Sequence, residues 1–351
     1  MKIKKMKKQD KQTYKVVRPP HLYIDFEKNE LMLKTFILMS IIAVASVIVM
    51  GLGAFIHIIT ALGVVLLVHS VIHSYQKLKG IDFTYETPAS PLVAGLIVGL
   101  SMPIAAPYEI TALVAFLMIL VFKYGQGKFL KRKYLNPAAA SKSFLLVLLS
   151  VMVFLEDSLA TGLLFHPHHL GLNLLTAEGF NNSMWIFAGK IIPFLGIELS
   201  AGQGLIFWQT HGWIGGASGI TVLIIGSIAA YWLRYKWRII VSGLVTMTLL
   251  SLGIGLIIGP DPFVRIAFHV FTGSFIFMIF FMATEPQSTP MPEISQYIFG
   301  ISVAVLTFVF QLFNVLGGSI FALMILNVIT PWLDKPIIRT PFGHKKTNGG
   351  A

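Results

Sequence analysis

The side chains that could do chemistry in this chain are mainly histidines, a few charges within apolar stretches, and hydroxyl groups. The 351 residues include no cysteine, which excludes disulfides, thiolate metal sites, iron–sulfur clusters and cysteine nucleophiles. His69 and His73 share one helix face, whereas a b-type haem needs two histidines that face each other at the same depth. His166, His168 and His169 are close enough to bind a metal ion, but a solvated loop is the simpler interpretation. We therefore predict neither a metal site nor a catalytic side chain.

Charged residues inside apolar stretches are costly, so the few that occur are candidate functional residues. Lys142 lies about one helical turn into such a stretch. We interpret it as an interface residue whose ammonium group snorkels, since a deep lysine would need a partner or a phosphate. Other polar residues near the ends of apolar stretches either line an ion or ligand site or cap helices, and for each alone we favour capping. These residues are Asn136, Thr284, Glu285, Asn327 and Asp334, and Glu109 opens another stretch.

The composition indicates a membrane protein. Hydrophobic residues make up 55% of the chain and charged residues only 12%, about half the charged fraction of a typical soluble protein. The net charge of +12 lies mostly beside apolar stretches, as the positive-inside rule expects, so it favours a topology signal over nucleic-acid binding.

The apolar runs predict an all-α polytopic membrane protein with about ten transmembrane helices, each near the roughly 20 residues that cross a bilayer. The spans are expected at residues 35–52, 54–75, 90–105, 107–123, 136–155, 213–233, 239–259, 267–284, 296–313 and 317–333. Lysine and arginine concentrate in the N-terminal tail and in alternate connections. Both termini are therefore expected on the cytoplasmic side of an inner membrane.

The spans divide into two inverted five-helix repeats, because an odd number of spans per half reverses its orientation. Five regions are expected: a basic cytoplasmic tail (1–34), the first half (35–155), an extracytoplasmic connection (156–212), the second half (213–333) and a cytoplasmic C-terminal tail (334–351). Residues 185–199 within the connection are apolar but short, which suits a re-entrant or interfacial segment.

The third span of each half runs into small residues and proline, at Gly99 to Pro107 and at Phe281 to Pro286. Broken helices of this kind can hold a ligand or ion near the middle of the membrane. A simple helix end before a loop explains the pattern equally well.

Four motifs, in order along the chain, carry a resemblance to the RnfD/NqrB family. Leu135-Asn136-Pro137-Ala138 matches F-N-P-A, and Phe281-Met282-Ala283-Thr284-Glu285-Pro286 matches F-M-A-T-D-P. Gly212 to Ser218 corresponds to G-x-x-G-E-T-S, with Gly216 in place of the glutamate, and Asn327 to Asp334 matches N-x-x-x-P-x-x-D. The chain resembles this family from about His21 to Asp334.

The resemblance implies a covalent FMN on Thr161. Relatives carry the flavin on the threonine of S-G-A-T, and Ser158-Leu159-Ala160-Thr161 occupies that place here, with Leu159 and the following Gly162 departing from the pattern. Ser158 and Ala160 complete the expected cofactor-binding residues. A hydroxyl in an exposed extracytoplasmic loop is accessible to a transferase, and the bound flavin supplies the redox chemistry. The resemblance also implies a second, noncovalent flavin, riboflavin or FMN, whose binding residues the sequence leaves unassigned.

The function expected from this resemblance is membrane electron transfer within an ion-translocating (Na⁺ or H⁺) oxidoreductase complex. Partners would be other membrane and flavin-bearing subunits of an Rnf- or Nqr-like complex, together with the lipid bilayer, and not nucleic acid. Gly216 removes a carboxylate that relatives have, which bears on ion coupling more than on electron transfer. The alternative is a flavin-free, channel-like permease for a small solute, because inverted five-span halves also resemble urea transporters.

Overall fold

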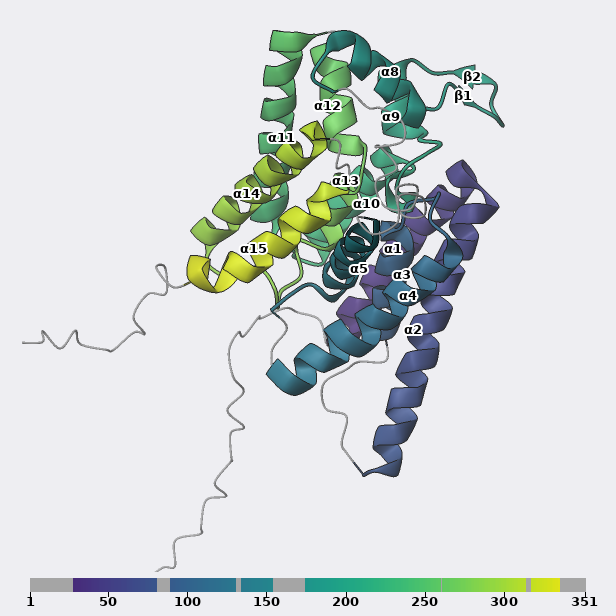
Figure 1. Ribbon diagram of the computed structural model, residues 1–351, viewed down its shortest axis with the longest axis vertical. Coiled ribbons are helices and arrows are strands. Elements are labelled where there is room, and N and C mark those ends of the chain that lie inside the picture. Colours follow the sequence, from purple (N-terminus) through teal and green to yellow (C-terminus); the bar gives the residue numbers. More distant parts are fainter. Residues whose placement is uncertain are drawn as a thin grey trace, which may run out of the picture.

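The computed structural model describes residues 28–80, 89–130, 134–153, 174–259, 261–313 and 317–334, and these fold almost entirely as helices (Figure 1). The first half contains α1 (Lys28–Met50), α2 (Leu52–Leu78), α3 (Ser90–Ser101), α4 (Tyr108–Leu117), which continues into η1 (Met118–Leu130), and α5 (Pro137–Val153). The second half contains α10 (Gly219–Trp232), α11 (Trp237–Ile258), α12 (Pro262–Phe271), α13 (Phe275–Phe281), α14 (Glu293–Leu312) and α15 (Gly318–Asp334).

A helix lies in each range where a membrane span is predicted, but the helices differ in length. Within the described ranges, 5 helices are long and apolar enough to cross a membrane, or 6 if α12 and α13, which meet at a 54° bend, form one span. The helices α3, α10 and α15 are apolar but shorter. The chain is therefore a mostly helical, multi-pass membrane protein, and the number of crossings depends on how the short helices are counted.

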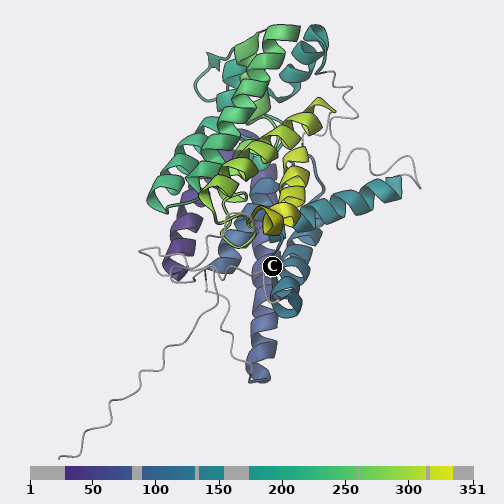
Figure 2. The ribbon, with the colours of Figure 1, turned by 90° about the vertical axis from the view of Figure 1, so that its left-hand side faces the viewer.

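The first half is organised around α2, the long helix that projects beyond the others in Figures 1 and 2. Gly95 and Gly99 of α3 lie against the backbone of α2, and a Cβ atom at Gly99 would stand 2.9 Å from the Cα atom of Ile58. Buried His57 of α2 also contacts Thr111 of α4, with 2.7 Å between Nδ1 and Oγ1. Small residues thus bring α2 and α3 together, as is common between helices in membranes.

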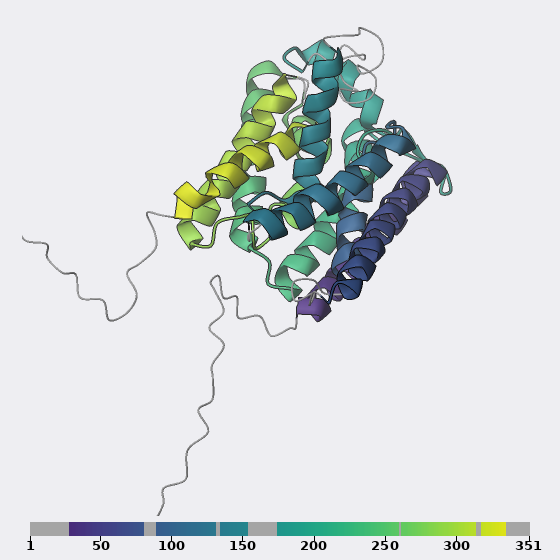
Figure 3. The same ribbon diagram turned by 60° about the horizontal axis from the view of Figure 1, so that its bottom comes forward.

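In the second half, α11 is the helix with the most extensive contacts. This helix packs on α12 and α14, as α2 packs on α3 and α4. Gly300 of α14 lies against the backbone of Ile239, and a side chain there would overlap it. The halves meet where α1 contacts α10 and where α5 contacts α15. Figure 3 shows the early helices, in purple and blue, and the late helices, in green and yellow, on opposite sides of the molecule.

A small cap at one end of the molecule comes from the connection between the halves. It contains α8 (Ala177–Phe187), the hairpin of β1 (Ile191–Ile192) and β2 (Ile197–Glu198), and α9 (Ala201–Phe207). The short η2 (Ile214–Gly216) follows and packs on α1, α3 and α13 inside the molecule. The apolar stretch 185–199 therefore forms the end of α8 and a hairpin rather than a membrane-crossing helix.

Arg265 of α12 holds this cap in place. Its fully buried guanidinium donates from Nε to the carbonyl of Gly259 at 2.9 Å and from Nη1 to the carbonyl of Leu174 at 2.5 Å. The guanidinium also lies 4.0 Å from the centroid of the Phe180 ring. One charged side chain thus joins the second half to the first described residue after the predicted flavin-bearing segment.

We expect Gly99→Ala to destabilise the protein by about 1–3 kcal/mol, because the added methyl group would push α3 away from the backbone of Ile58. Thermal unfolding of the purified chain in detergent measures the loss. Gly63→Ala is the matched control, because a Cβ atom at Gly63 of α2 meets nothing within 4 Å. Equal melting temperatures for the two variants would contradict this packing.

Candidate functional site

Asn136, at the start of α5, joins two of the sequence motifs. Its Oδ1 accepts hydrogen bonds from the backbone N–H groups of Ala138 and Ala139, each at 3.1 Å, so the side chain caps α5 as predicted. Its Nδ2 donates to the carbonyl of Met282 at 3.2 Å. The cap is therefore also a contact with the second half, because Met282 follows α13.

Asn327, inside α15, adds a third motif to the same cluster. With its amide oriented to suit its neighbours, the nitrogen donates to the carbonyl of Ser288 at 3.0 Å and the oxygen accepts from the N–H of Asn136 at 3.0 Å. Both asparagines are buried. Asn327 lies well inside its helix and bridges two loops, so capping is the wrong interpretation for this residue.

The fourth motif packs on the end of α3. Residues Pro103 and Trp213 form an isolated antiparallel bridge, in which the N–H of Ile104 donates to the carbonyl of Gly212 at 2.9 Å. Glycine is required at position 215, because a Cβ atom there would lie 2.9 Å from the carbonyl oxygen of Leu100. The backbone beyond α3 is thus paired with a strand-like segment from the other half.

Lys142 does not snorkel. It is 5% exposed and donates a hydrogen bond to the carbonyl of Ser101, the last residue of α3, while its ammonium group lies 5.6 Å from the Trp213 ring centroid. A helix ends in unpaired carbonyls that carry partial negative charge, and a cation there is stabilising. Lys142 therefore caps the buried C-terminal end of α3. The sequence pattern alone does not distinguish this role from that of a lysine at the membrane interface.

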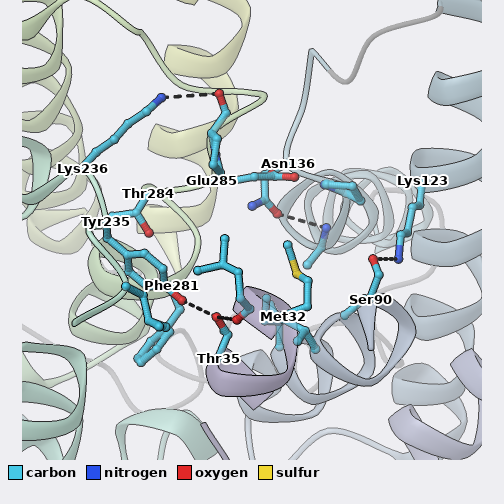
Figure 4. A pocket seen from close by; sticks show the side chains of 18 of the residues that line it. Met32, Thr35, Ser90, Lys123, Asn136, Tyr235, Lys236, Phe281, Thr284 and Glu285 are labelled. Carbon is cyan, nitrogen blue, oxygen red and sulfur yellow. Dashed lines mark hydrogen bonds between the residues drawn. The ribbon is translucent and has the colours of Figure 1, made fainter. Parts of the chain in front are cut away.

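A cavity lies where the starts of α1, α3 and α5 face the 233–236 turn and the segment after α13 (Figure 4). Its volume is about 180 Å³, and its mouth is open. The lining is largely apolar, with Met32, Val93, Ile97 and Phe281 among the walls. The cavity thus lies between the halves, at the end of the molecule opposite to α8.

Several polar groups converge on this apolar space. Lys123, only 4% exposed, donates to Ser90 Oγ at 2.9 Å. Lys236 donates to the carbonyl of Thr289 at 2.9 Å, and the carboxylate of Glu285 accepts from Ser288 Oγ at 3.1 Å. Figure 4 shows Lys123 and Lys236 on opposite sides of the space, with Asn136 and Glu285 between them. The cavity can therefore take a ligand that has an apolar body and several hydrogen-bond acceptors.

Tyr235 lines the cavity with a neutral hydroxyl group. Its oxygen lies 2.7 Å from Thr35 Oγ1, which connects the 233–236 turn to α1. Burial raises the pKa of Tyr235 to about 12, and the bond to Thr35 opposes this only in part. The phenol therefore stays protonated at physiological pH and can donate or accept a hydrogen bond.

Histidines in the described helices contact neutral polar side chains. His69 Nδ1 lies 2.7 Å from the Tyr124 hydroxyl, and His269 Nδ1 lies 2.9 Å from Gln311 Oε1. No group of three or more His, Cys, Asp or Glu that could hold a metal ion occurs among the described residues. The histidines 166, 168 and 169 lie outside them, so the expectation for that trio stays a prediction.

The proposed flavin-site residues Ser158, Ala160 and Thr161 also lie outside the described residues. The described chain approaches them from two directions, through the end of α5 and through Leu174. Of the other polar candidates, Glu109 is exposed in the first turn of α4 and Asp334 accepts from the N–H of Met291 at 3.2 Å.

The cavity residues Lys123, Lys236 and Ser90 were not singled out from the sequence as ligand-binding residues. The two lysines stand in basic stretches beside apolar runs, where the positive-inside rule explains them fully. Their pairing with Ser90 and Thr289 depends on residues 33 and 53 positions away, and no local pattern reports such contacts.

Comparison with known proteins gives one family and several relatives. A model of the NQR2, RnfD, RnfE family matches residues 15–343. A subunit of the ion-translocating oxidoreductase complex of Shewanella sediminis is 24% identical and aligns over 95% of this chain and 99% of its own. A subunit of the proton-translocating ferredoxin:NAD(+) oxidoreductase complex of Clostridium ljungdahlii is 24% identical over 96% of this chain and 98% of its own. A subunit of the Na(+)-translocating ferredoxin:NAD(+) oxidoreductase complex of Acetobacterium woodii is 27% identical over 70% of each chain.

Asn136→Ala should destabilise the contact between the halves by about 1–3 kcal/mol, because it removes the cap of α5 and the shorter of two hydrogen bonds to the buried carbonyl of Met282. Asn182→Ala, at an exposed position of α8, is the control. Unfolding in detergent measures both. A double-mutant cycle with Asn327→Ala should give a coupling energy above about 0.5 kcal/mol. Additive effects would show that the two amides act independently.

Proposed function

The chain belongs to the NQR2, RnfD, RnfE family, and we propose on that premise that it is a membrane electron-transfer subunit of an ion-translocating oxidoreductase complex. The observation that carries the proposal is the convergence of the motifs. Two asparagines 191 positions apart and the carbonyl of Met282 form one hydrogen-bonded cluster beside a cavity. Relatives whose names describe such complexes align with nearly the whole chain.

We propose that the membrane part is a ten-crossing pair of inverted repeats with both termini on the cytoplasmic side. Matching helix contacts support this arrangement, because α2 with α3 and α4 corresponds to α11 with α12 and α14. The contacts of α1 with α10 and of α5 with α15 are those that a twofold relation would place at its axis. In this topology the cavity opens toward the cytoplasm, and the α8 cap faces the other side.

We propose that Thr161 carries a covalent FMN on the extracytoplasmic side. The segment that contains it ends at Leu174, which the buried guanidinium of Arg265 holds at 2.5 Å. A cation at this point has the charge that suits a flavin phosphate, and the Nη2 atom of Arg265 has no hydrogen-bond partner among the described residues. The flavin supplies the redox chemistry when bound.

A second, noncovalent flavin is proposed for the cavity between the halves. Met32, Ile97 and Phe281 would pack against an apolar ring, while Lys123 and Asn136 would donate to its acceptors. The lining residues therefore suit a group of this kind in their chemistry. The volume of the cavity is about 180 Å³, below the roughly 300–1,000 Å³ of ordinary ligand pockets, so a flavin would extend into the open mouth.

The helix α5 would set the separation of the two sites. It begins next to Asn136 at the cavity and leads toward Thr161, and its 17 residues span roughly 25 Å. Asn136 fixes its start against the second half, and Lys142 fixes it to the end of α3. A rigid spacer of this kind keeps the distance between two electron carriers constant, which electron transfer requires.

In-gel fluorescence tests the covalent site. The full chain, co-expressed with a flavin transferase, should fluoresce on a denaturing gel, and Thr161→Ala should abolish the signal. Thr210→Ala, which removes an exposed hydroxyl in the same connection, should keep it. Unchanged fluorescence of Thr161→Ala would place the flavin elsewhere.

A wild-type chain that carries no flavin would instead favour the small-solute permease. In that case reconstituted vesicles should pass a small neutral solute such as urea, and the electron-transfer proposal would fail.

The cavity site is tested by noncovalent flavin content. Acid extraction releases only the unattached flavin, and Lys123→Met should lower its retention about tenfold, the effect of losing one charge-assisted hydrogen bond. Lys128→Met, at an exposed position of the same helix η1, should retain the wild-type amount. Equal losses in both variants would contradict the assignment.

A further inference from the structure

A second hollow lies between α10 and α11 on the outside of the second half. It is a groove of about 740 Å³, and its lining runs from the 234–238 turn up the two helices. Ile240, Val241 and Leu244 of α11 line it, with Phe280 of α13 also in contact. The 234–236 turn borders both this groove and the cavity between the halves, and the two linings have no other residue in common.

The groove opens onto an apolar face of the molecule. Along α11 the residues Trp237, Val241, Val245 and Leu249 recur at intervals of four and are 45–61% exposed, which is the spacing of one helix face. On α10, Tyr231 is 90% exposed. In a chain of this composition such a face meets lipid chains, so the groove is accessible from the bilayer rather than from water.

One end of the groove is strongly basic. Arg234, Lys236 and Arg238 occur within five residues and all border it, and no acidic side chain of the described residues is part of its lining. Arg238 is paired with Glu293 at 2.5 Å, and its guanidinium lies 5.1 Å from the Trp237 ring centroid. The lining of the mouth is therefore positively charged. Aromatic side chains such as Trp237 beside it are typical of the membrane–water interface.

The backbone at the mouth is held in an unusual conformation. Arg234 has a φ of 52°, the left-handed region that residues other than glycine seldom adopt. This turn places an exposed arginine at the end of α10, where a glycine would close the helix with less strain. Such strain at a residue other than glycine is frequent at functional sites.

We propose that this groove is a binding site for one anionic phospholipid. The phosphate would lie beside Arg234. Lys236, whose ammonium group donates to Thr289 and Pro286, would contribute its positive charge nearby. An acyl chain would lie along α10 and α11 against Ile240 and Leu244. Basic pockets between membrane helices commonly bind such head groups. A free phosphate would use only the mouth, and a zwitterionic lipid would gain little from the net charge. The combination of a basic mouth and an apolar channel selects a lipid that has both parts.

Photo-crosslinking tests the site. The full chain is reconstituted in phosphatidylcholine nanodiscs that contain trace phosphatidylglycerol with a photoreactive acyl chain, and labelled peptides are mapped by mass spectrometry. Labelling should concentrate on residues 237–244. Unlabelled phosphatidylglycerol should compete, whereas glycerol phosphate in solution should not.

Arg234→Gly is the informative variant, because glycine accepts the left-handed turn and the protein should fold at least as stably as the wild type. Removing one interfacial cation should weaken labelling about fivefold. Lys77→Gln, which removes an exposed cation from the end of α2 outside the groove, should leave it unchanged. Uniform labelling of all lipid-facing helices, equal labelling by a phosphatidylcholine probe, or an equal loss in both variants would overturn the proposal.

Discussion

The need to satisfy backbone groups away from water is the constraint that shapes the interior of this protein. An unpaired carbonyl or N–H group in a membrane costs several kcal/mol, and short or broken helices create such groups in the interior. Here the segments between helices receive hydrogen bonds from side chains of distant elements. Asn136 donates to the carbonyl of Met282 in the other half, and Asn327 donates to that of Ser288 while accepting from the N–H of Asn136. The bonds that complete the backbone are therefore also the bonds that join the halves.

Two buried cations also supply hydrogen-bond donors to backbone carbonyls. Lys142 donates to the carbonyl of Ser101 at the end of α3, and Arg265 donates to the carbonyls of Gly259 and Leu174. Each supplies donors where water has no access, and each lies against an aromatic ring, that of Trp213 or of Phe180. A buried positive charge in this protein thus stabilises loops and helix ends.

The hydrogen bonds of Asn136 and Lys142 also fix the position of α5, which would separate the two proposed flavin sites. The α5 helix is fixed at its start by Asn136 and about one and a half turns later by Lys142, so buried bonds place the first part of a roughly 25 Å rod. The cavity forms at one end of this rod because two halves of the chain meet there. Electron carriers placed at the ends of a helix held in this way would keep their separation through thermal motion of the surrounding lipid.

The membrane class, the helix positions and the family were all predictable from the amino-acid order, because they depend on local hydrophobicity and on motifs that occur in sequence. The cap formed by Asn136 was predictable too, since it is a contact over two or three residues. The depth of Lys142, the bridging role of Asn327 and the cavity around Lys123 and Lys236 emerge only from the packing of the folded chain. Each depends on partners between 33 and 191 positions away, and the exposure of a lysine in a helix is set by what packs against it rather than by its neighbours in sequence.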